Sequence, residues 1–398
     1  MKTVLSAYTA TSALGVGRAA HAEALRRGSS GLKRCDFETA RIDTWIGEAP
    51  GTDRVALPAA LGHYDARNNR LALLALRADG FEDAARAALE RHGAERVALI
   101  LGTSTSAILE TEIAYRYRDP ASGALPAHFD YRATHNTGSV AAFVRDLLGL
   151  RGPAMVISTA CSSAAKAFAA ADRMLRAGVA DAAIVGGVDS LCLTTLYGFS
   201  SLELSSPEPC RPCDRARRGL SIGEGAAYAL LERRAPRAGE IVLAGWGESS
   251  DAHHMSSPHP EGRGALAAMR GALARAGLAE RDIGYVNLHG TATPANDAVE
   301  GLAVGALFGR AVPCSSTKGA TGHTLGAAGG VEAVISALAL ELALIPASVG
   351  TRDPDPAIAL DIALAPREAP GLAHVLSNSF GFGGSNASLV FSRTGAGA

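Results

Sequence analysis

The chain has few cysteines, no excess of charge of either sign and no long apolar run. Its six cysteines are too few and too scattered for a disulfide framework in 398 residues, which favours a reducing compartment such as the cytoplasm. Lys plus Arg (38) nearly balances Asp plus Glu (39), so no global field recruits nucleic acid or a membrane, and we expect neither as a partner. No window approaches the roughly 20 uninterrupted apolar residues of a membrane span. Ser, Thr and Tyr interrupt the apolar part of the first segment, which argues against a signal peptide. We therefore expect a soluble, cytoplasmic protein.

What is present is a globular composition, 47% hydrophobic and 19% charged, in which strand-like and Ala-rich helix-like runs alternate. In the first half, strands are predicted at 96–102, 155–158 and 182–187, with a helix that ends near residue 176. The same order returns with strands at 241–247, 285–290 and 386–391 and helices at 264–276, near 297–307 and in GVEAVISALAL. The connector RRAPRAGE separates the halves. The pattern predicts a duplicated α/β protein with halves 1–235 and 236–398, and a turn-rich excursion at 118–138 that could contact a partner.

Cys161 in STACSSAAKAF follows a predicted strand and begins a predicted helix that stops near Gly178. The unpaired N–H groups of a helix N-terminus favour an anion by about 0.3 to 1 kcal/mol, and by up to about 2 when partly buried, so we expect a lowered thiol pKa. Small neighbours leave room for an acyl group. The alternative is an inert buried cysteine, which is a common structural residue.

Two histidines stand in Gly-rich turns. His289 ends an apolar strand in NLHGTATPAND, which is a usual place for ligand sites in α/β proteins. His323 lies in SSTKGATGHTLGAAGG, five residues after Lys318. A lone buried histidine is usually structural, but two in strand-to-helix turns favour a functional site. The glycines of SNSFGFGGSN let backbone N–H groups approach a ligand closely.

Taken in order, these segments resemble those of the β-ketoacyl-acyl carrier protein synthases, which are condensing enzymes of the thiolase-like superfamily. The resemblance covers nearly the whole chain, through VLSAYTATSALG, CRPCDRARRGLSIGEGAAYALLE, SSDAHHMSSPHPEG, HGTATPAND, TKGATGHTLGAAGG and SFGFGGSN. It implies a thiolase-like fold, with duplicated αβαβα layers and two mixed central sheets. It also implies a decarboxylative Claisen condensation of an acyl thioester with malonyl-acyl carrier protein.

The resemblance also implies roles for individual residues. Cys161 would carry the acyl group, while neutral His289 and His323 would each donate from Nε2 to the malonyl thioester carbonyl. Lys318 and Glu332 would organise the histidine pair. The remaining implied residues are the oxyanion-hole backbone N–H groups of Cys161 and Phe382, the Phe382 ring as a gate, and the substrate-binding residues Thr291, Thr293, Phe380 and Gly381. Simple turn capping is the alternative for the two threonines.

No metal and no resident cofactor are expected, because the phosphopantetheine arrives on the carrier protein. The pair Cys210-x-x-Cys213 lacks a second such pair and occupies the family's RPFD position, so a structural loop is favoured over zinc. Nearby arginines could dock an acidic carrier protein or could be buried in ion pairs, namely Arg211, Arg215, Arg217 and Arg218. Arg218 also departs from the aspartate that is usual in the family.

Other readings stay open at this point. A non-decarboxylating thiolase-type acyltransferase is disfavoured because no clear second catalytic cysteine motif stands near the C-terminus. A chain-length-factor-like subunit is disfavoured because the nucleophile is present. The family implies a homodimer, or a heterodimer with a chain-length-factor-like homologue. GVDSLCLTTLYGFSSLEL looks closer to synthases of aryl-polyene pathways than to those of housekeeping fatty-acid synthesis.

Overall fold

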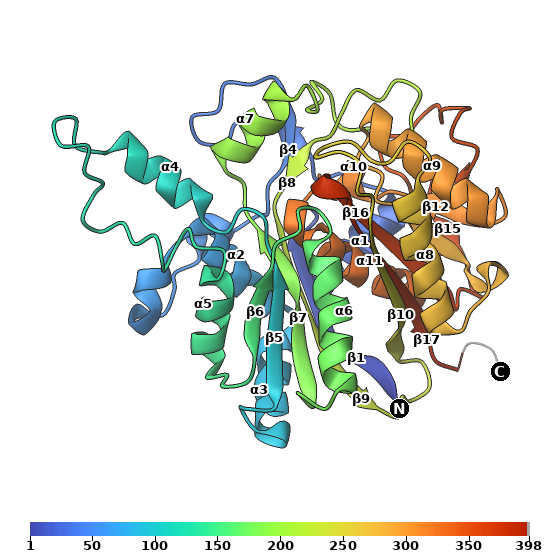
Figure 1. Ribbon diagram of the computed structural model, residues 1–398, viewed down its shortest axis with the longest axis horizontal. Coiled ribbons are helices and arrows are strands. Elements are labelled where there is room, and N and C mark those ends of the chain that lie inside the picture. Colours follow the sequence, from blue (N-terminus) through green and yellow to red (C-terminus); the bar gives the residue numbers. More distant parts are fainter. Residues whose placement is uncertain (396–398) are drawn as a thin grey trace.

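The computed structural model describes residues 1–395, which form five layers, αβαβα (Figure 1). The strands of the N-terminal half, in spatial order, are β1 (Lys2–Ser12), β9 (Gly225–Arg234), β7 (Ala182–Asp189), β5 (Val97–Gly102) and β6 (Ala154–Ile157). Those of the C-terminal half are β10 (Ile241–Ser250), β17 (Ser385–Arg393), β16 (His374–Gly381), β11 (Tyr285–Asn287), β12 (Pro313–Ser315) and β14 (Asp361–Ile362). In both halves two antiparallel pairings are followed by parallel ones.

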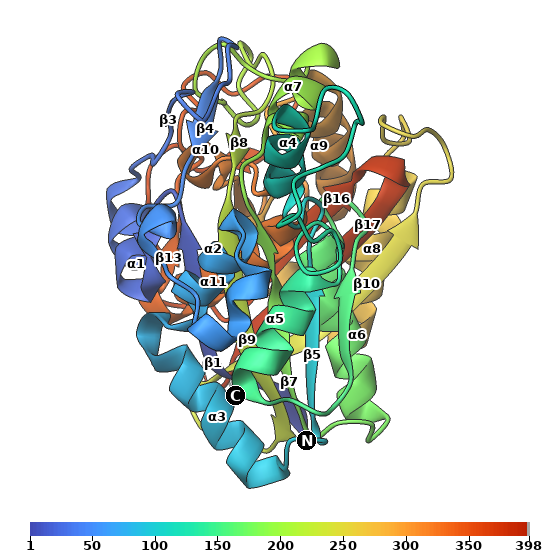
Figure 2. The ribbon, with the colours of Figure 1, turned by 90° about the vertical axis from the view of Figure 1, so that its left-hand side faces the viewer.

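Helices cover both outer faces and fill the space between the half-sheets (Figure 1), and Figure 2 looks onto the N-terminal outer face. The N-terminal outer face carries α2 (Arg67–Leu76), α3 (Phe81–His92) and α5 (Ser139–Leu148). The C-terminal outer face carries α8 (Arg263–Ala276), against which α9 (Pro294–Phe308) packs. The central layer is α6 (Ser163–Arg176) and α11 (Ala328–Leu342), each of which contacts strands of both halves. The predicted α/β class and duplicated layering are therefore confirmed.

The two predicted sheets are joined into one. β1 and β10 pair at Thr3–Leu243 and Val4–Val242, and this short pairing links the halves into a 12-stranded sheet. Immediately beyond it both strands have register shifts in their other pairings, between Leu5 and Ala7 and between Leu243 and Gly245. Bulges bend a strand away from its neighbour, so the half-sheets diverge and leave room for the central helices. The boundary between 235 and 236 stays a prediction.

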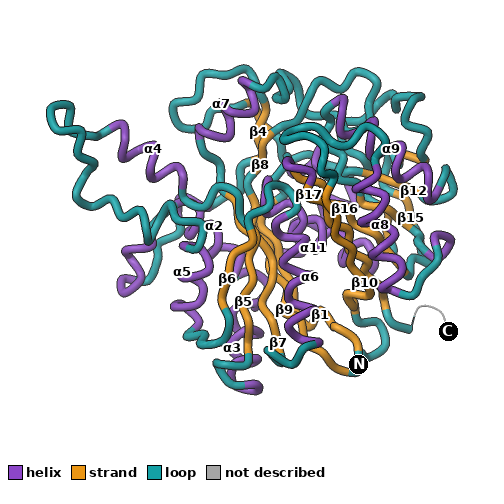
Figure 3. Tube along the Cα trace, viewed as in Figure 1, coloured by secondary structure: helices purple, strands orange, loops and turns teal. Residues whose placement is uncertain are grey.

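The remaining elements are short or lie at the periphery. They are β2 (Gly15–Val16), α1 (Gly17–Arg27), β3 (Lys33–Arg34), β4 (Trp45–Gly47), α4 (Ile108–Arg116), α7 (Leu193–Ser201), β8 (Ile222–Gly223), α10 (Lys318–Thr321), β13 (Leu344–Ile345) and β15 (Arg367–Glu368). The segment 118–138 forms no helix or strand and, with α4, projects from the body, as expected of an excursion (Figure 1). Loops gather at the end of the molecule opposite the N-terminus (Figure 3).

Small residues explain why the central helices lie so close to the sheet and to each other. A Cβ on Gly102 would lie 2.3 Å from the backbone nitrogen of Ala164, and one on Gly329 would lie 2.7 Å from that of Ala165. Any larger side chain would push α6 or α11 outward. The Ala- and Gly-rich segments thus fix the depth at which Cys161 lies, two residues before α6 begins.

One helical stretch, Leu325–Leu342, could span a membrane by length and composition alone. Glu332 and Glu341 interrupt it, so the expectation that no run of roughly 20 uninterrupted apolar residues exists is not contradicted. In this structure 89% of that stretch is buried inside the protein, and its side chains belong to the main hydrophobic core. Its apolar composition is therefore explained by its place in the central layer.

Candidate active site

Cys161 stands in a tight turn between β6 and α6. Ala160, just before it, has a left-handed backbone with φ of 53°, which is uncommon for a residue with a side chain. The turn is held by Ser163, whose Oγ accepts the N–H of Thr159 at 2.9 Å and donates to the carbonyl of Ala160. Cys161 is 6% exposed. The predicted position beside a helix N-terminus is confirmed.

His289 is held by its backbone. Glu300 in α9 accepts the N–H of His289 at 2.8 Å and that of Gly290 at 2.7 Å, and it also accepts from Asn378 at 3.1 Å. Gly290 has φ of +38°, and a Cβ there would lie 2.4 Å from the Cβ of Ser316. The turn after β11 therefore has one orientation, which points the imidazole into the cavity.

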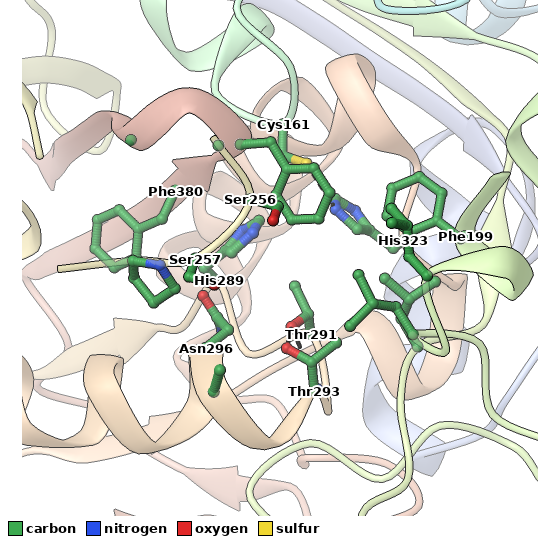
Figure 4. A pocket seen from close by; sticks show the side chains of 18 of the residues that line it. Cys161, Phe199, Ser256, Ser257, His289, Thr291, Thr293, Asn296, His323 and Phe380 are labelled. Carbon is green, nitrogen blue, oxygen red and sulfur yellow. Dashed lines mark hydrogen bonds between the residues drawn. The ribbon is translucent and has the colours of Figure 1, made fainter. Parts of the chain in front are cut away.

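His323 is clamped between the two halves of the chain. Its N–H donates to the carbonyl of Ser221 at 2.8 Å, and its carbonyl accepts from Gly223 at 2.9 Å. Its Nε2 lies 3.0 Å from Sγ of Cys161. The His289 and His323 rings are 5.3 Å apart at 83°. Figure 4 shows the thiol and both rings directed into one pocket.

Lys318 determines which nitrogen of His289 carries the proton. Its ammonium lies 3.2 Å from Nδ1 of His289, 2.5 Å from the carbonyl oxygen of His289, and in hydrogen-bond contact with Glu332. An ammonium can only donate, so Nδ1 of neutral His289 accepts and Nε2–H faces the cavity. Within residues 1–395, Nδ1 of His323 has no partner, so that ring can adopt either tautomer. The predicted ion pair between Lys318 and Glu332 is confirmed, and both side chains are buried.

The resting site is electrically neutral at its reacting atoms. Burial raises the pKa of the Cys161 thiol to about 12, which outweighs the lowering by the Lys318 ammonium and by the Phe382 N–H. The expectation of a lowered thiol pKa was therefore wrong, because the cost of removing a thiolate from water exceeds the benefit of the helix terminus. Burial, and then the Lys318 charge, hold the pKa values of His289 and His323 well below their ordinary range. Burial raises the pKa of Glu332 to about 7 against the influence of Lys318.

A cavity of about 250 Å³ connects these groups to the surface (Figure 4). Its lining includes all the remaining residues that the sequence assigned to the site, Thr291, Thr293, Phe380, Gly381 and Phe382. Thr291 and Thr293 share a hydrogen bond of 2.9 Å, and the Phe382 ring packs against that of Phe199 at 5.7 Å. A Cβ on Gly381 would lie 3.3 Å from the backbone nitrogen of Cys161, so the glycine brings the two N–H-bearing segments together.

Sequence reasoning missed the carboxylates that hold the site loops. Buried Asp189 accepts from the backbone of Ser104, Thr105 and Gly326 and thereby ties a loop to the turn before α11. Glu300 holds the His289 turn. At the cavity mouth Asp251 accepts from Asn386 at 2.8 Å. Each of these three carboxylates accepts hydrogen bonds from residues of another segment of the chain, and no sequence motif links the carboxylate to those residues. The one available signal was the position of Asp189 directly after an apolar run.

The loop with paired cysteines is structural in its contacts. Cys210 donates to the carbonyl of Lys318 at 3.3 Å, and Cys213 packs in the core beside α8 and α9. Of the four arginines, Arg217 is 8% exposed and pairs with Asp355 at 2.6 Å, so the ion-pair alternative holds for it. Arg215 and Arg218 are exposed.

Side chains close enough together to bind one metal ion are found in the active site, not in the loop with paired cysteines. They are the Cys161 thiol and the imidazoles of His289 and His323. The sulfur and one nitrogen of each ring lie within 4.8 Å of one another.

Comparison with known proteins agrees with this geometry. Residues 66–236 match the beta-ketoacyl synthase N-terminal domain, and residues 241–352 match its C-terminal domain. Over 262 residues the chain is 39% identical to 3-oxoacyl-(acyl-carrier-protein) synthase 2 of Vibrio cholerae, an alignment that covers 62% of this chain and 63% of that protein. The match to the mitochondrial synthase of Arabidopsis thaliana is 41% identical and covers 61% of this chain and 57% of that protein. The alignments thus span less than two thirds of these curated relatives.

Among solved structures, one similar chain is the ketosynthase ApeO of Xenorhabdus doucetiae, determined in complex with its chain length factor ApeC. The TM-score is 0.90 at 38% identity, over 99% of this chain and 98% of that chain. The ishigamide ketosynthase/chain length factor matches with a TM-score of 0.89 at 27% identity, over 99% of both chains. The layered fold with its cysteine and two histidines is that of the thiolase-like condensing enzymes. The chain belongs to the β-ketoacyl synthase family.

Proposed function

We propose that the protein is a β-ketoacyl-acyl carrier protein synthase that joins an acyl group to a two-carbon unit from malonyl-acyl carrier protein. The observation that carries the proposal is the single cavity in which Cys161 Sγ lies 3.0 Å from His323 and Lys318 directs the Nε2–H of His289 inward. A nucleophile, a proton acceptor and a fixed donor are the groups that the two half-reactions require.

In the first half-reaction Cys161 attacks the acyl thioester of the carrier protein. Because the thiol is neutral at rest, its proton passes to Nε2 of neutral His323 as the C–S bond forms, and His323 then returns it to the departing pantetheine thiolate. The backbone N–H groups of Cys161 and Phe382 stabilise the tetrahedral oxyanion. The products are an acyl-Cys161 thioester and a free carrier thiol.

In the second half-reaction malonyl-acyl carrier protein enters. The Nε2–H of His289 donates to its thioester carbonyl, and His323 in its Nε2–H tautomer provides a second donor. The malonyl carboxylate leaves as carbon dioxide and its electron pair forms an enolate. The enolate carbon attacks the acyl-Cys161 carbonyl, and the C–S bond breaks. The thiolate takes up one proton from solvent, and the product is a 3-oxoacyl carrier protein extended by two carbons.

Two substitutions test this function. Cys161→Gln is expected to abolish condensation and acylation while malonyl decarboxylation stays measurable, because the histidines remain. His289→Ala is expected to lose decarboxylation while Cys161 still gains an acyl mass on incubation with acyl carrier protein. Intact-protein mass spectrometry and release of labelled carbon dioxide report the two events separately. Loss of both events in both variants, with the proteins folded, would contradict the assignment.

We further propose that an acidic acyl carrier protein docks beside the cavity mouth at the exposed Arg218. The next residue, Gly219, donates to the carbonyl of Ala292 in the loop that lines the cavity. Arg218→Glu is expected to reduce turnover with carrier-bound substrates more than turnover of small pantetheine thioesters. Arg310→Glu is the control, because Arg310 is also exposed but follows the far end of α9, about 20 Å away along the helix. Equal losses with both kinds of substrate would exclude docking.

We also propose an assembly, a location and a pathway for the protein. A homodimer, or a heterodimer with a chain-length-factor-like homologue, is supported by the two structural relatives that are described with chain length factors. A cytoplasmic location agrees with six free cysteines. A specialised pathway of the aryl-polyene type rests on the segment around 187–204. Co-purification with native mass analysis and a panel of acyl carrier substrates would decide between these alternatives.

A further inference from the structure

The thiol and the two imidazoles of the active site are spaced as ligands for a soft divalent metal ion. Tetrahedral Zn²⁺ binds sulfur at about 2.3 Å and nitrogen at about 2.0 to 2.1 Å, so its ligand atoms stand roughly 3.3 to 3.6 Å apart. The sulfur of Cys161 and one ring nitrogen each of His289 and His323 already lie within 4.8 Å of one another. All three residues are buried, and the cavity provides space for a fourth ligand. Small movements would complete a three-ligand site.

Lys318 places a hydrogen-bond donor where a metal site needs an acceptor. A metal-bound histidine coordinates through one ring nitrogen and donates the proton on the other, usually to a carboxylate or carbonyl. Here Nδ1 of His289 faces the Lys318 ammonium at 3.2 Å, so the proton stays on Nε2, the nitrogen that faces the cavity. In that tautomer Nε2 has no lone pair for a metal.

The ammonium cannot readily turn away from this position. It also donates to the carbonyl of His289 and to the carboxylate of Glu332, and it is 1% exposed. The carbonyl belongs to His289 itself, and Glu332 binds the same ammonium that lies 3.2 Å from Nδ1 of His289. The donor is therefore fixed by the same contacts that keep the buried charge of Lys318 satisfied.

We propose that Lys318 keeps the Cys161, His289 and His323 cluster free of Zn²⁺ and similar ions by holding His289 in the Nε2–H tautomer. Without the ammonium, the imidazole proton can move to Nδ1, where the Glu332 carboxylate becomes the acceptor. Metal binding then displaces the thiol proton of Cys161 to solvent, and the ion with one thiolate carries a single net positive charge. Lys318 is here a positioning residue, and this role holds whichever thioester the enzyme uses.

Cobalt(II) absorption tests the proposal without any turnover assay, because a tetrahedral Co²⁺–thiolate site gives charge-transfer and ligand-field bands. Chelator-treated protein is titrated with Co²⁺. Wild type and Lys318→Arg, which keeps the cation, should give no thiolate band at stoichiometric metal. Lys318→Met and Lys318→Gln should give it, with an affinity at least roughly 10- to 100-fold above wild type. Adding Cys161→Ser to Lys318→Met should remove the band.

Either of two results would overturn the proposal. One is a thiolate band in wild type at the same metal concentration, and the other is its absence in folded Lys318→Met and Lys318→Gln, with folding checked by circular dichroism and thermal melting. A measurement on the wild type decides the matter even if both variants fail to fold. Nitrogen-15 NMR of labelled histidine must show His289 protonated at Nε2, and protonation at Nδ1 would refute the mechanism.

Discussion

Alanine at position 381 is expected to remove most of the condensing activity while the protein stays folded. The new methyl carbon would lie 2.8 Å from the carbonyl oxygen of Thr159 and 3.3 Å from the backbone nitrogen of Cys161, whereas ordinary contact begins near 3.4 Å. The Phe382 loop and the Cys161 turn must therefore separate by about half an ångström. Overpacking of this size typically costs about 1 to 3 kcal/mol of stability. Misplacing one oxyanion donor costs about 2.7 to 4 kcal/mol of barrier, or roughly 10² to 10³ in kcat.

Steady-state condensation with acyl and malonyl carrier proteins measures this loss, and alkylation of Cys161 with iodoacetamide shows that the thiol is still accessible. Gly383→Ala is the matched control in the same loop. Gly383 has φ of +78°, and a Cβ added there would have no atom within 4 Å, so alanine costs about 1 to 2 kcal/mol in backbone strain without touching the Cys161 turn. Full kcat in Gly381→Ala, or an equal loss in Gly383→Ala, would refute the oxyanion-hole reasoning.

Three further outcomes are expected. Because burial raises the pKa of Cys161 to about 12, its alkylation rate should rise about tenfold for each pH unit from 7 to 10, whereas a plateau by about pH 10 would show a freely ionising thiol with a pKa of about 8.5. Arg217→Ala should lower the free energy of unfolding in urea by about 1.5 to 3 kcal/mol because it breaks a partly buried, charge-assisted hydrogen bond to Asp355, while Arg215→Ala should change it by no more than about 1 kcal/mol. Glu300→Gln leaves one buried N–H of the His289 turn without an acceptor, so it should lower stability by about 1 to 3 kcal/mol and also lower kcat. An unchanged kcat would show that the turn keeps its orientation without the second carboxylate oxygen.

Much of the fold could be predicted because its main strands are buried on both faces. β5 and β7 are buried along their whole length, so they appear in the sequence as continuous apolar runs with glycine near their ends. β3, β4, β8, β13 and β15 are two or three residues long, which is too short for any periodic signal. The pairing that joins the half-sheets also involves few residues, and only the three-dimensional path of β1 and β10 determines it.

The residues of the site could be predicted from the sequence, but the protonation state of the Cys161 thiol could not. Cys161, His289 and His323 each stand in a turn whose small residues are visible in the sequence, and the structure brings them together. The thiol pKa depends on a quantity that no local pattern contains, namely how completely the surrounding residues exclude water. The helix terminus contributes at most about 2 kcal/mol, while full burial of a charge can change a pKa by about 3 to 5, which corresponds to about 4 to 7 kcal/mol. Burial therefore determines the pKa of the Cys161 thiol.

The neutrality of the resting site bears on the choice between decarboxylating and non-decarboxylating chemistry. Among the residues that line the cavity in the described part of the chain there is no lysine or arginine, and Phe380 and Phe382 form part of the wall. The Lys318 charge is directed away from the cavity into Glu332 and His289. A malonyl carboxylate that enters this space gives up its hydration and finds no positively charged side chain to replace it. Carbon dioxide is neutral, so it requires neither hydration nor a cation. In the proposed reaction the same surroundings favour release of carbon dioxide, and the Nε2–H of His289 stabilises the negative charge only where it reappears, on the enolate oxygen.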